Sequence, residues 1–471
     1  MIKLIIEKEL RDIITSAKFA VTFGVCSVLV VLSFYVGGRN YQIATEQYDA
    51  AQRGELKTFA GITDWREVRD HSVFLRPQPI ASLVMGVSND IGRDASVRSG
   101  SQIDAQDSRY SEEPIYAVFR FLDLEFIFQI VLSLFAILFA YDALNGEKER
   151  GTLRLTFANA IPRSTYILGK MAGSFLALAV PLLVPILTGV LVLLVMGIPF
   201  QSTDWVRLAI VIVAGYLYFG AFLAISLFLS SRTTSSSTSF MLALIVWILS
   251  VMIIPRTAVL FAGRAVDVPT VDELYSQRSR YSASLWQENR LAMSNYRVPP
   301  GEPMQKAIPE FQAFMADLSQ TRDRKVADFT RQLEENRQNK QSVQERLAFG
   351  LARISPSATF SLAAMTLSGT GIHLKDEFTR AAKRYQQSFA EFLKEKTGET
   401  PSGGMIFRIS TDNTTKQKPP INAAEIPAFT FDQAPVSGVL GAAAVDFGIL
   451  ALFNIVFFAG AFVSFLRYDV R

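Results

Sequence analysis

The chain has 471 residues, of which 50% are hydrophobic and 19% are charged, and its mean hydropathy is +0.25. The formal net charge of +4 comes from 47 basic and 43 acidic residues, without the concentrated basic stripes of a nucleic-acid-binding protein. One cysteine excludes an internal disulfide, and two isolated histidines predict no metal site. The apolar residues form long runs, which predicts a membrane protein.

The first segment, residues 1–18, combines an apolar stripe with a charged stripe at helical period. It is predicted to be an amphipathic helix in the membrane interface, with a helix packed on a soluble core as the alternative. Residues 19–38 carry no charge and are long enough to cross the bilayer. They are longer than the apolar part of a usual signal peptide, so they are predicted to form the first span.

A polar insert, residues 39–120, follows the first span and contains no spanning run. A helix is expected over residues 41–59 and a loose loop over residues 95–113. Trp65, Phe74 and Leu75 are expected to dip into the membrane interface, where aromatic rings are favoured.

Further apolar runs predict the remaining spans over residues 121–141, 171–203, 206–231, 233–255 and 441–466. The fold class is therefore an all-α polytopic membrane protein with six transmembrane helices. Basic residues cluster before residue 19, within residues 142–170, and in the tail, residues 467–471. Because basic residues concentrate on the cytoplasmic side, both termini and the loop 142–170 are predicted to be cytoplasmic.

The second outer insert, residues 256–440, is predicted to be largely helical. Residues 310–352 and 378–392 keep a three-four apolar rhythm, which predicts an antiparallel hairpin with its tip near residues 336–346. Between them, residues 354–365 are apolar but too short to span. They are expected to lie on the outer membrane surface, with a plain core helix as the alternative.

Small residues recur at a spacing of four near the start of the third span, at Gly169, Gly173 and Ala177. Such a stripe allows another helix to approach closely. The alternative is a chance run of small residues in an apolar helix.

Catalytic motifs are missing from the sequence. Gly169-Lys170 is followed by Met171, and Ser164 stands where a phosphate loop needs its first glycine. There is no H-E-x-x-H and no G-x-S-x-G. The uncharged cores of the spans, such as residues 126–140, contain neither Asp nor Glu, which argues against a proton relay. The chain is therefore not predicted to be an enzyme.

The loop between the second and third spans is densely charged, breaks at a glycine and starts a new amphipathic turn. It resembles the first cytoplasmic loop of ABC-2 type permeases, which has acidic residues, Gly-Thr-Leu, a Pro-Arg pattern and a Gly-Lys pair. Here these are Glu147, Glu149, Gly151-Thr152-Leu153, Pro162-Arg163 and Gly169-Lys170.

A further resemblance covers most of the chain. It is similar to an ABC-2 subgroup with a large insert between the fifth and sixth spans, akin to the gliding-motility and nitrous-oxide-reductase maturation permeases. The similar fragments are Ser355-Pro356, residues 367–371, residues 426–429 and residues 467–471.

The resemblance implies that the loop forms a coupling helix that docks on a separate ATP-binding subunit. Its apolar contacts would be Leu153, Leu155 and Phe157. The rest of the implied interface is Glu147, Glu149, Arg150, Gly151 and Thr152.

The same resemblance implies the membrane subunit of an ATP-driven exporter in a bacterial inner (cytoplasmic) membrane. ATP and Mg would be bound by the partner, with no cofactor in this chain, and a second permease copy or a paralogue would complete the assembly. The alternative is a mechanotransmission or scaffold complex, in which ATP hydrolysis moves the outer insert against an extracytoplasmic partner and nothing crosses the membrane.

Overall fold

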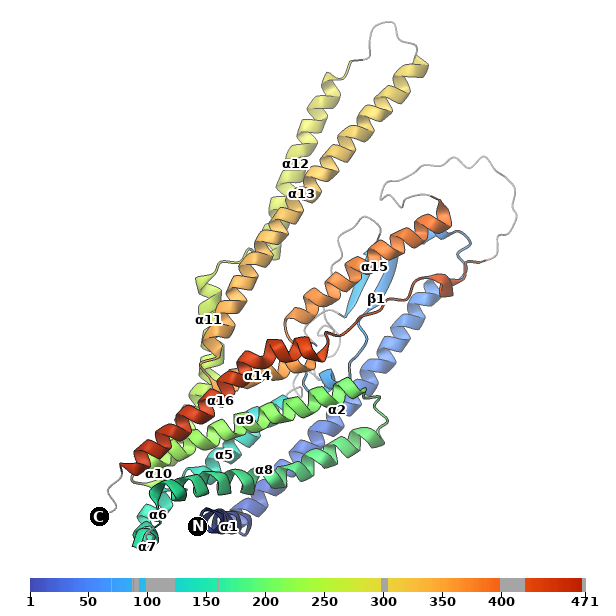
Figure 1. Cartoon of the computed structure of the whole chain (residues 1–471). Helices are drawn as coiled ribbons and strands as arrows, with labels where there is room; N and C mark the ends of the chain where they lie inside the picture. The colour runs from blue at the N-terminus through green and yellow to red at the C-terminus, as the bar shows by residue number, and fades with distance from the viewer. Residues whose placement is uncertain are drawn as a thin grey trace. The chain divides into compact units, whose positions relative to one another are not determined.

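The computed structural model describes residues 1–68, 70–86, 88, 93–98, 123–158, 161–297, 304–398 and 420–467. These parts of the chain are almost entirely helical (Figure 1). They contain six helices long and apolar enough to cross a membrane, which confirms the all-α polytopic fold class. These helices are Ala17–Thr58, Leu124–Glu149, Arg163–Val195, Ser202–Arg232, Ser236–Ala265 and Val436–Leu466.

The chain divides into two compact units, each described here by itself. Unit 1 comprises Met1–Met252 and Ser355–Arg471, and unit 2 comprises Ile253–Ile354. Unit 1 contains most of the spanning helices. It also contains a second, smaller apolar cluster, called the outer core below, which includes Phe59, Val73, Phe378 and Phe389. Unit 2 consists of helices α11 (Ile254–Ala265), α12 (Val271–Asn295) and α13 (Met304–Ala352).

Helix α9 (Ser202–Arg232) is the central helix of unit 1, and its middle turns are buried on every side. A capping box between Gln201 and Asp204 starts the helix. Its neighbours bury their apolar faces against it, so the core lies along α9. They are α5 (Ser133–Ala140), α8 (Arg163–Val195), α10 (Ser236–Ile248), α14 (Pro356–Ser368) and α16 (Val436–Leu466).

The first span is the start of a much longer helix. Ser16 caps the N-terminus of α2 by accepting a hydrogen bond from the Phe19 amide at 3.1 Å, and α2 then runs without a break from Ala17 to Thr58. The helix predicted over residues 41–59 is therefore the continuation of the span. Two segments of π-helix interrupt other spans, η4 (Ile127–Leu132) and η5 (Leu249–Ile253).

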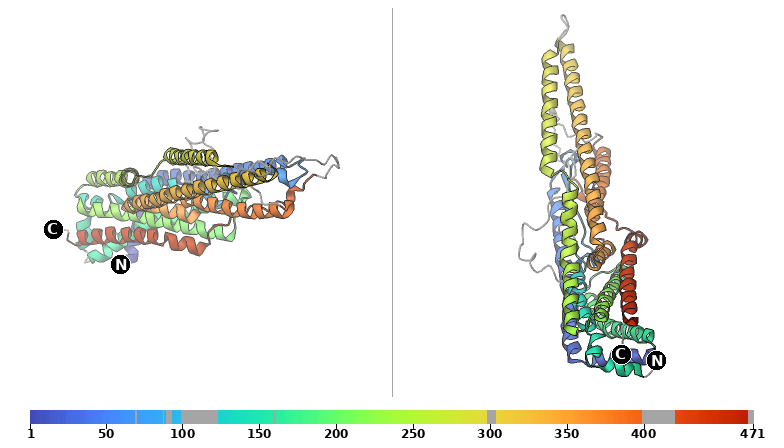
Figure 2. Two further views of the ribbon diagram at one scale, coloured as in Figure 1. Left: turned by 90° about the horizontal axis from the view of Figure 1, so that it is seen from above. Right: turned by 90° about the vertical axis from the view of Figure 1, so that its left-hand side faces the viewer.

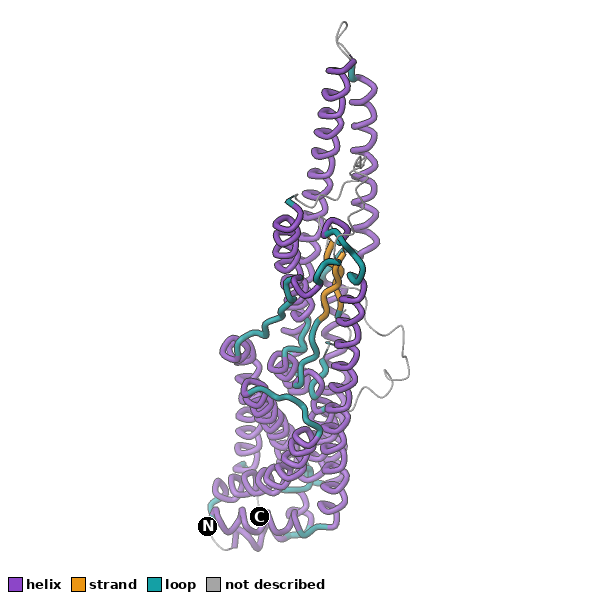
Figure 3. Tube along the Cα trace, turned by 90° about the vertical axis from the view of Figure 1, so that its right-hand side faces the viewer, coloured by secondary structure: helices purple, strands orange, loops and turns teal. Residues whose placement is uncertain are grey.

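The outer core of unit 1 contains a small sheet that the sequence did not predict. Strands β1 (Asp70–Phe74) and β2 (Asp94–Arg98) pair antiparallel, shown in orange in Figure 3. Helix α15 (His373–Thr397) packs its apolar stripe into the same core. The loop expected over residues 95–113 is therefore wrong at residues 95–98, and the remainder lies outside the described residues.

Aromatic residues of the first insert also belong to this outer core. The Trp65 ring lies 5.1 Å from the Phe392 ring, and Leu75 is buried in the same cluster. These contacts with protein side chains replace the membrane contacts expected from the sequence. Aromatic rings are stabilised both in protein cores and at membrane interfaces, so their presence alone could not distinguish the two environments.

The second insert contains a helical hairpin, but α13 pairs with a different helix from the one predicted. In unit 2, α13 packs against α12, with the Tyr281 and Phe329 rings 4.3 Å apart and Arg322 stacked 4.1 Å above the Trp286 ring. The predicted partner, residues 378–392, lies within α15 and buries its stripe in the outer core of unit 1. The predicted tip, residues 336–346, lies within α13.

The short apolar segment at residues 354–365 is a core helix. Ser355 caps α14, and Phe360, Ala363, Ala364 and Leu367 are buried between α9 and α16. The expectation of a membrane-surface helix was wrong, because protein side chains cover the apolar residues. Hydrophobicity alone does not distinguish burial in protein from contact with lipid.

His71 on β1 gives the outer core a predicted pH dependence. Its Nδ1 lies 3.3 Å from Glu55 Oε1, and the Phe59, Tyr385 and Phe389 rings surround the imidazole. Burial lowers the pKa of His71 below its usual 6.5, although the Glu55 carboxylate opposes this effect. The folded state therefore favours neutral imidazole, and its stabilising contribution is present above pH 6.5 and lost as the pH falls below it.

We expect hydrogen exchange at β1 to accelerate on acidification, by up to about tenfold per pH unit after correction for intrinsic exchange. His71→Gln should flatten this dependence. An unchanged slope in His71→Gln would assign the effect to another group.

Candidate functional site: the α6–α7 junction

Two short helices connect α5, in the apolar part of the second span, to α8, which contains the third. Helix α6 covers Asn145–Glu149 and helix α7 covers Thr152–Ala158. Gly151 joins them at φ +71°, a left-handed conformation that favours glycine. Both helices lie at the end of unit 1 where the N-terminal helix α1 (Ile2–Ile14) and the end of α16 also lie (Figures 1 and 2).

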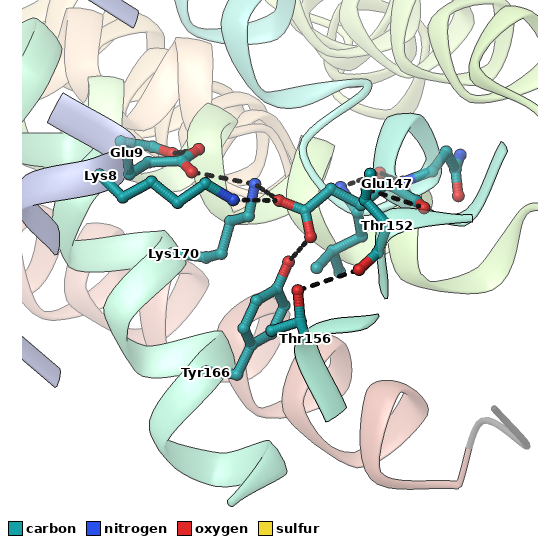
Figure 4. Close-up of polar contacts among 11 residues, drawn as sticks. Lys8, Glu9, Glu147, Thr152, Thr156, Tyr166 and Lys170 are labelled. Carbon is teal, nitrogen blue, oxygen red and sulfur yellow. Dashed lines mark hydrogen bonds and ion pairs between the residues drawn. The ribbon is translucent and has the colours of Figure 1, made fainter. Parts of the chain in front are cut away.

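A buried ion cluster connects α6 to α1 and α8. The Lys170 ammonium on α8 lies 2.9 Å from Glu9 Oε2 and 3.0 Å from Glu147 Oε1 (Figure 4). Lys170 and Glu9 are each only 6% exposed. The Tyr166 hydroxyl donates a short hydrogen bond to Glu147, and Lys8 Nζ lies 3.5 Å from the same carboxylate. One buried ammonium thus links two carboxylates from different segments.

Other polar residues of α6 form hydrogen bonds with the turn that connects α9 to α10. Lys148 Nζ donates to the carbonyl oxygens of Ser231 at 3.1 Å and Thr233 at 3.4 Å, at the negative end of α9. The Glu149 carboxylate accepts hydrogen bonds from the Ser236 amide and hydroxyl, both at 2.8 Å, at the positive end of α10. The two opposite charges therefore complement the dipoles of two helices.

Asn145 completes this junction from a fully buried position. Its side-chain amide donates to Thr233 Oγ1 at 2.7 Å, and its backbone amide donates to Ser230 Oγ at 3.2 Å. Helix α6 is therefore bonded to α1, α8, α9 and α10 at once. The contacts of Lys170 and Asn145 are buried, whereas those of Lys8 and Glu149 lie at the surface.

Helix α7 has one face turned inward and one turned outward. Leu153 is 2% exposed and packs among Tyr166, Ile167 and Phe465, while the Phe157 ring lies 5.4 Å from the Tyr166 ring. Leu155, on the opposite face, is 70% exposed. The expected apolar contact set is therefore divided, because Leu153 and Phe157 hold α7 against the bundle and Leu155 faces away from it.

The predicted polar rim is divided in the same way. Glu147 belongs to the buried cluster, and Glu149 is engaged at the start of α10. The exposed residues of the predicted interface are Glu149, Arg150, Gly151, Thr152 and Leu155, and among these Glu149 is hydrogen-bonded to Ser236. Arg154 also belongs to this exposed surface, although the sequence reasoning missed it. The helical period could have found it, since positions 153 and 157 share one face and 154 and 155 lie away from it.

The stripe of small residues on α8 is where α1 packs. A Cβ added at Gly169 would lie 2.8 Å from Ile5 Cγ2, and one added at Gly173 would lie 2.7 Å from Glu9 Cβ. Ala177, the third residue of the stripe, is fully buried. The close approach of α1 is what places Glu9 within reach of Lys170.

We expect Gly173→Ala to lower the stability of unit 1 by about 1–3 kcal/mol, because the added methyl group overlaps Glu9. Gly24→Ala is the matched control, since a Cβ there meets nothing within 4 Å and alanine favours the helix. Thermal unfolding of both variants in detergent measures the difference. Equal unfolding temperatures would mean that α1 does not pack tightly at this position.

Comparison with known proteins agrees with this arrangement. The family model for ABC-2 family transporter proteins matches residues 4–470, nearly the whole chain. The chain is also 34% identical over 125 residues to the probable ABC transporter permease protein NosY of Stutzerimonas stutzeri. That alignment covers 26% of this chain and 45% of NosY, so the chain spans less than half the length of this curated relative.

Family membership rests on the match along the chain together with the spanning helices. It implies a membrane-embedded, multi-pass protein in a lipid bilayer. In such transporters the membrane subunit is not the catalytic one. The chain therefore belongs to the ABC-2 transporter family, as a transmembrane permease subunit of an ABC transporter.

Proposed function

We propose that this chain is the membrane subunit of an ATP-driven exporter and that the α6–α7 junction couples it to a separate ATP-binding subunit. The observation that carries the proposal is the set of bonds from α6 to four helices, beside the outward face of α7. The sequence has no phosphate loop, so ATP and Mg belong to the partner subunit.

The outward face of the junction is the proposed docking surface. Leu155 supplies the apolar contact, and Arg150, Thr152 and Arg154 surround it. Buried Leu153 and half-buried Phe157 act indirectly, since they fix α7 to the bundle. A displacement of α7 by the ATP-binding subunit is passed to α6 and from there to the bundle, because packed elements move as bodies.

In this proposal both termini and the junction face the cytoplasm of a bacterium, and the protein lies in the inner membrane. Two permease copies, or this chain and a paralogue, assemble with two ATP-binding subunits. Unit 2 and the outer core of unit 1 then face an extracytoplasmic partner.

A mechanical role is the second candidate function. The long helical hairpin of unit 2 exposes large apolar side chains, including Tyr275, Trp286 and Leu291. Contiguous apolar patches outside the membrane mark protein-binding surfaces, and in this candidate function these side chains belong to one. In the mechanical version, the same ATP-driven motion acts on a partner bound there and nothing is exported.

Purification from the native host in mild detergent tests the proposal. We expect an ATP-binding subunit to copurify at a one-to-one ratio and to hydrolyse ATP in the complex. A chain that purifies alone, or only with extracytoplasmic proteins, would overturn the coupling assignment. ATP-dependent release of a bound extracytoplasmic partner, without movement of any solute, would favour the mechanical role.

A further inference from the structure

A carboxylic acid is buried at the outer end of the second span. Glu125 lies on α4 (Leu124–Phe126) and is 8% exposed. Its neighbours Leu124, Ile127 and Phe128 belong to the main apolar core of unit 1. In the sequence, Glu125 directly precedes the uncharged core of the second span, residues 126–140. Because a buried carboxylate is costly, either a cation must neutralise Glu125 or the carboxyl group must keep its proton.

The partner of this acid is a hydroxyl group on α14. Ser361 Oγ donates a short hydrogen bond to Glu125 Oε1. One turn further along both helices, Gln129 Nε2 donates to Ser357 Oγ at 2.7 Å. Two polar pairs therefore join the second span to α14 side by side. Tyr218 reinforces the second pair by donating to the Gln129 carbonyl oxygen at 2.8 Å, within the π-helical segment η4.

The charged groups around Glu125 do not compensate a negative charge. Asp123, two residues away, accepts hydrogen bonds from the Met85 and Phe126 amides at 3.2 and 2.8 Å and is itself an acid, so it supplies no positive charge. Helix α14 carries no ionisable side chain, while α2 and α9 contribute Tyr41 and Tyr218 to the surrounding core. Among the described residues, no lysine, arginine or histidine forms an ion pair with Glu125.

These surroundings favour the uncharged acid. Burial away from water disfavours an ionised carboxyl group, and a neighbouring carboxylate disfavours it further. A neutral acid can accept from Ser361 through one oxygen and keep its proton on the other. Separation of α14 from α4 would admit water to the carboxyl group and remove the reason for it to stay neutral.

We propose that Glu125 is a proton-binding site, which holds a proton while α4 and α14 are in contact and releases it when they part. The O–H bond of the carboxyl group breaks, the proton passes to water, and the carboxylate keeps the electron pair. The opening motion rests on the proposed transport cycle, whereas the protonated resting state does not. The site lies just outside the uncharged core of the second span, whose lack of Asp and Glu argued against a proton relay.

Infrared spectroscopy of the purified full chain at neutral pH tests the protonated state directly. We expect a carbonyl-stretch band of a protonated carboxyl group that is lost in Glu125→Gln, a variant that keeps the shape and the hydrogen-bonding capacity. Ser361→Ala should shift this band because it removes the hydroxyl partner. Ser357→Ala, one turn away on the same helix, is the matched control and should leave the band in place.

An identical spectrum for wild type and Glu125→Gln in this region, or the loss of a carboxylate band instead, would overturn the proposal. Should Glu125→Gln fail to fold, the comparison of Ser361→Ala with Ser357→Ala decides the matter, and a band that neither substitution moves would contradict it.

The link to transport is tested on the assembled complex with its ATP-binding subunit. ATP turnover of the wild type should change with pH by up to about tenfold per pH unit where proton release accompanies the limiting step, and Glu125→Gln should flatten this profile. Identical profiles would overturn the proton release. If no complex forms, the proposed coupling fails while the infrared result still stands, so the two failures are distinguishable.

Discussion

Replacing Lys170 by Met is expected to destabilise unit 1 by about 3–5 kcal/mol, since it leaves two buried carboxylates without their cation. Lys170 lies 2.9 Å from Glu9 and 3.0 Å from Glu147. The two negative charges would then repel each other inside the bundle. The expected result is release of α1 from α8, measured as a lower unfolding temperature and faster proteolysis between α1 and α2.

Two variants make this prediction specific. Lys8 approaches the same Glu147 carboxylate at 3.5 Å, but its side chain is 57% exposed, so Lys8→Met should change stability by less than about 1 kcal/mol. Adding Glu9→Gln and Glu147→Gln to Lys170→Met removes the uncompensated charge and should restore most of the stability. A Lys170→Met protein as stable as the wild type would contradict the role assigned to the cluster.

Leu155→Asp should weaken binding of the ATP-binding subunit while the permease stays folded. Leu155 is 70% exposed on the outward face of α7, so a carboxylate there stays hydrated and does not affect the stability of the permease. It loses its hydration only when the partner covers it. Desolvating that charge at the centre of an interface should weaken binding by at least about 2 kcal/mol, or about 30-fold. Binding of the purified subunits to wild type and variant measures this loss.

Leu153→Asp is the informative comparison, because it lies on the opposite face of the same helix. Leu153 is 2% exposed among Tyr166, Ile167 and Phe465, so the charge would be buried in the bundle itself. We expect this variant to lose both stability and partner binding, whereas Leu155→Asp loses binding alone. Normal affinity in Leu155→Asp would show that the partner docks elsewhere.

The spanning helices were predictable because membrane insertion requires long apolar segments with internally bonded backbones. The partners of each helix were not. Residues 378–392 have the stripe of a hairpin helix, yet they pack into the outer core of unit 1, and α12 packs on α13 instead. An apolar stripe specifies that a helix is covered but not what covers it.

The junction was located from the sequence, but its two faces were not distinguished. The acidic residues of the loop suggested a charged rim, whereas Glu147 lies inside the cluster with Lys170. Lys170 and Glu9 are far apart in the chain, so only the packing of α1 on Gly173 brings them together. Glu125 was missed for the same reason, since Ser361 and the rest of α14 bury it from a distant part of the chain.

The most direct test of the central claim is photo-crosslinking from position 155 in native membranes. A photoreactive residue in place of Leu155 should form an adduct with the ATP-binding subunit, whereas one in place of Leu56, an exposed residue near the end of α2, should not. Adducts from position 155 to lipid or to extracytoplasmic proteins, with the ATP-binding subunit captured from position 56, would contradict the proposed coupling surface.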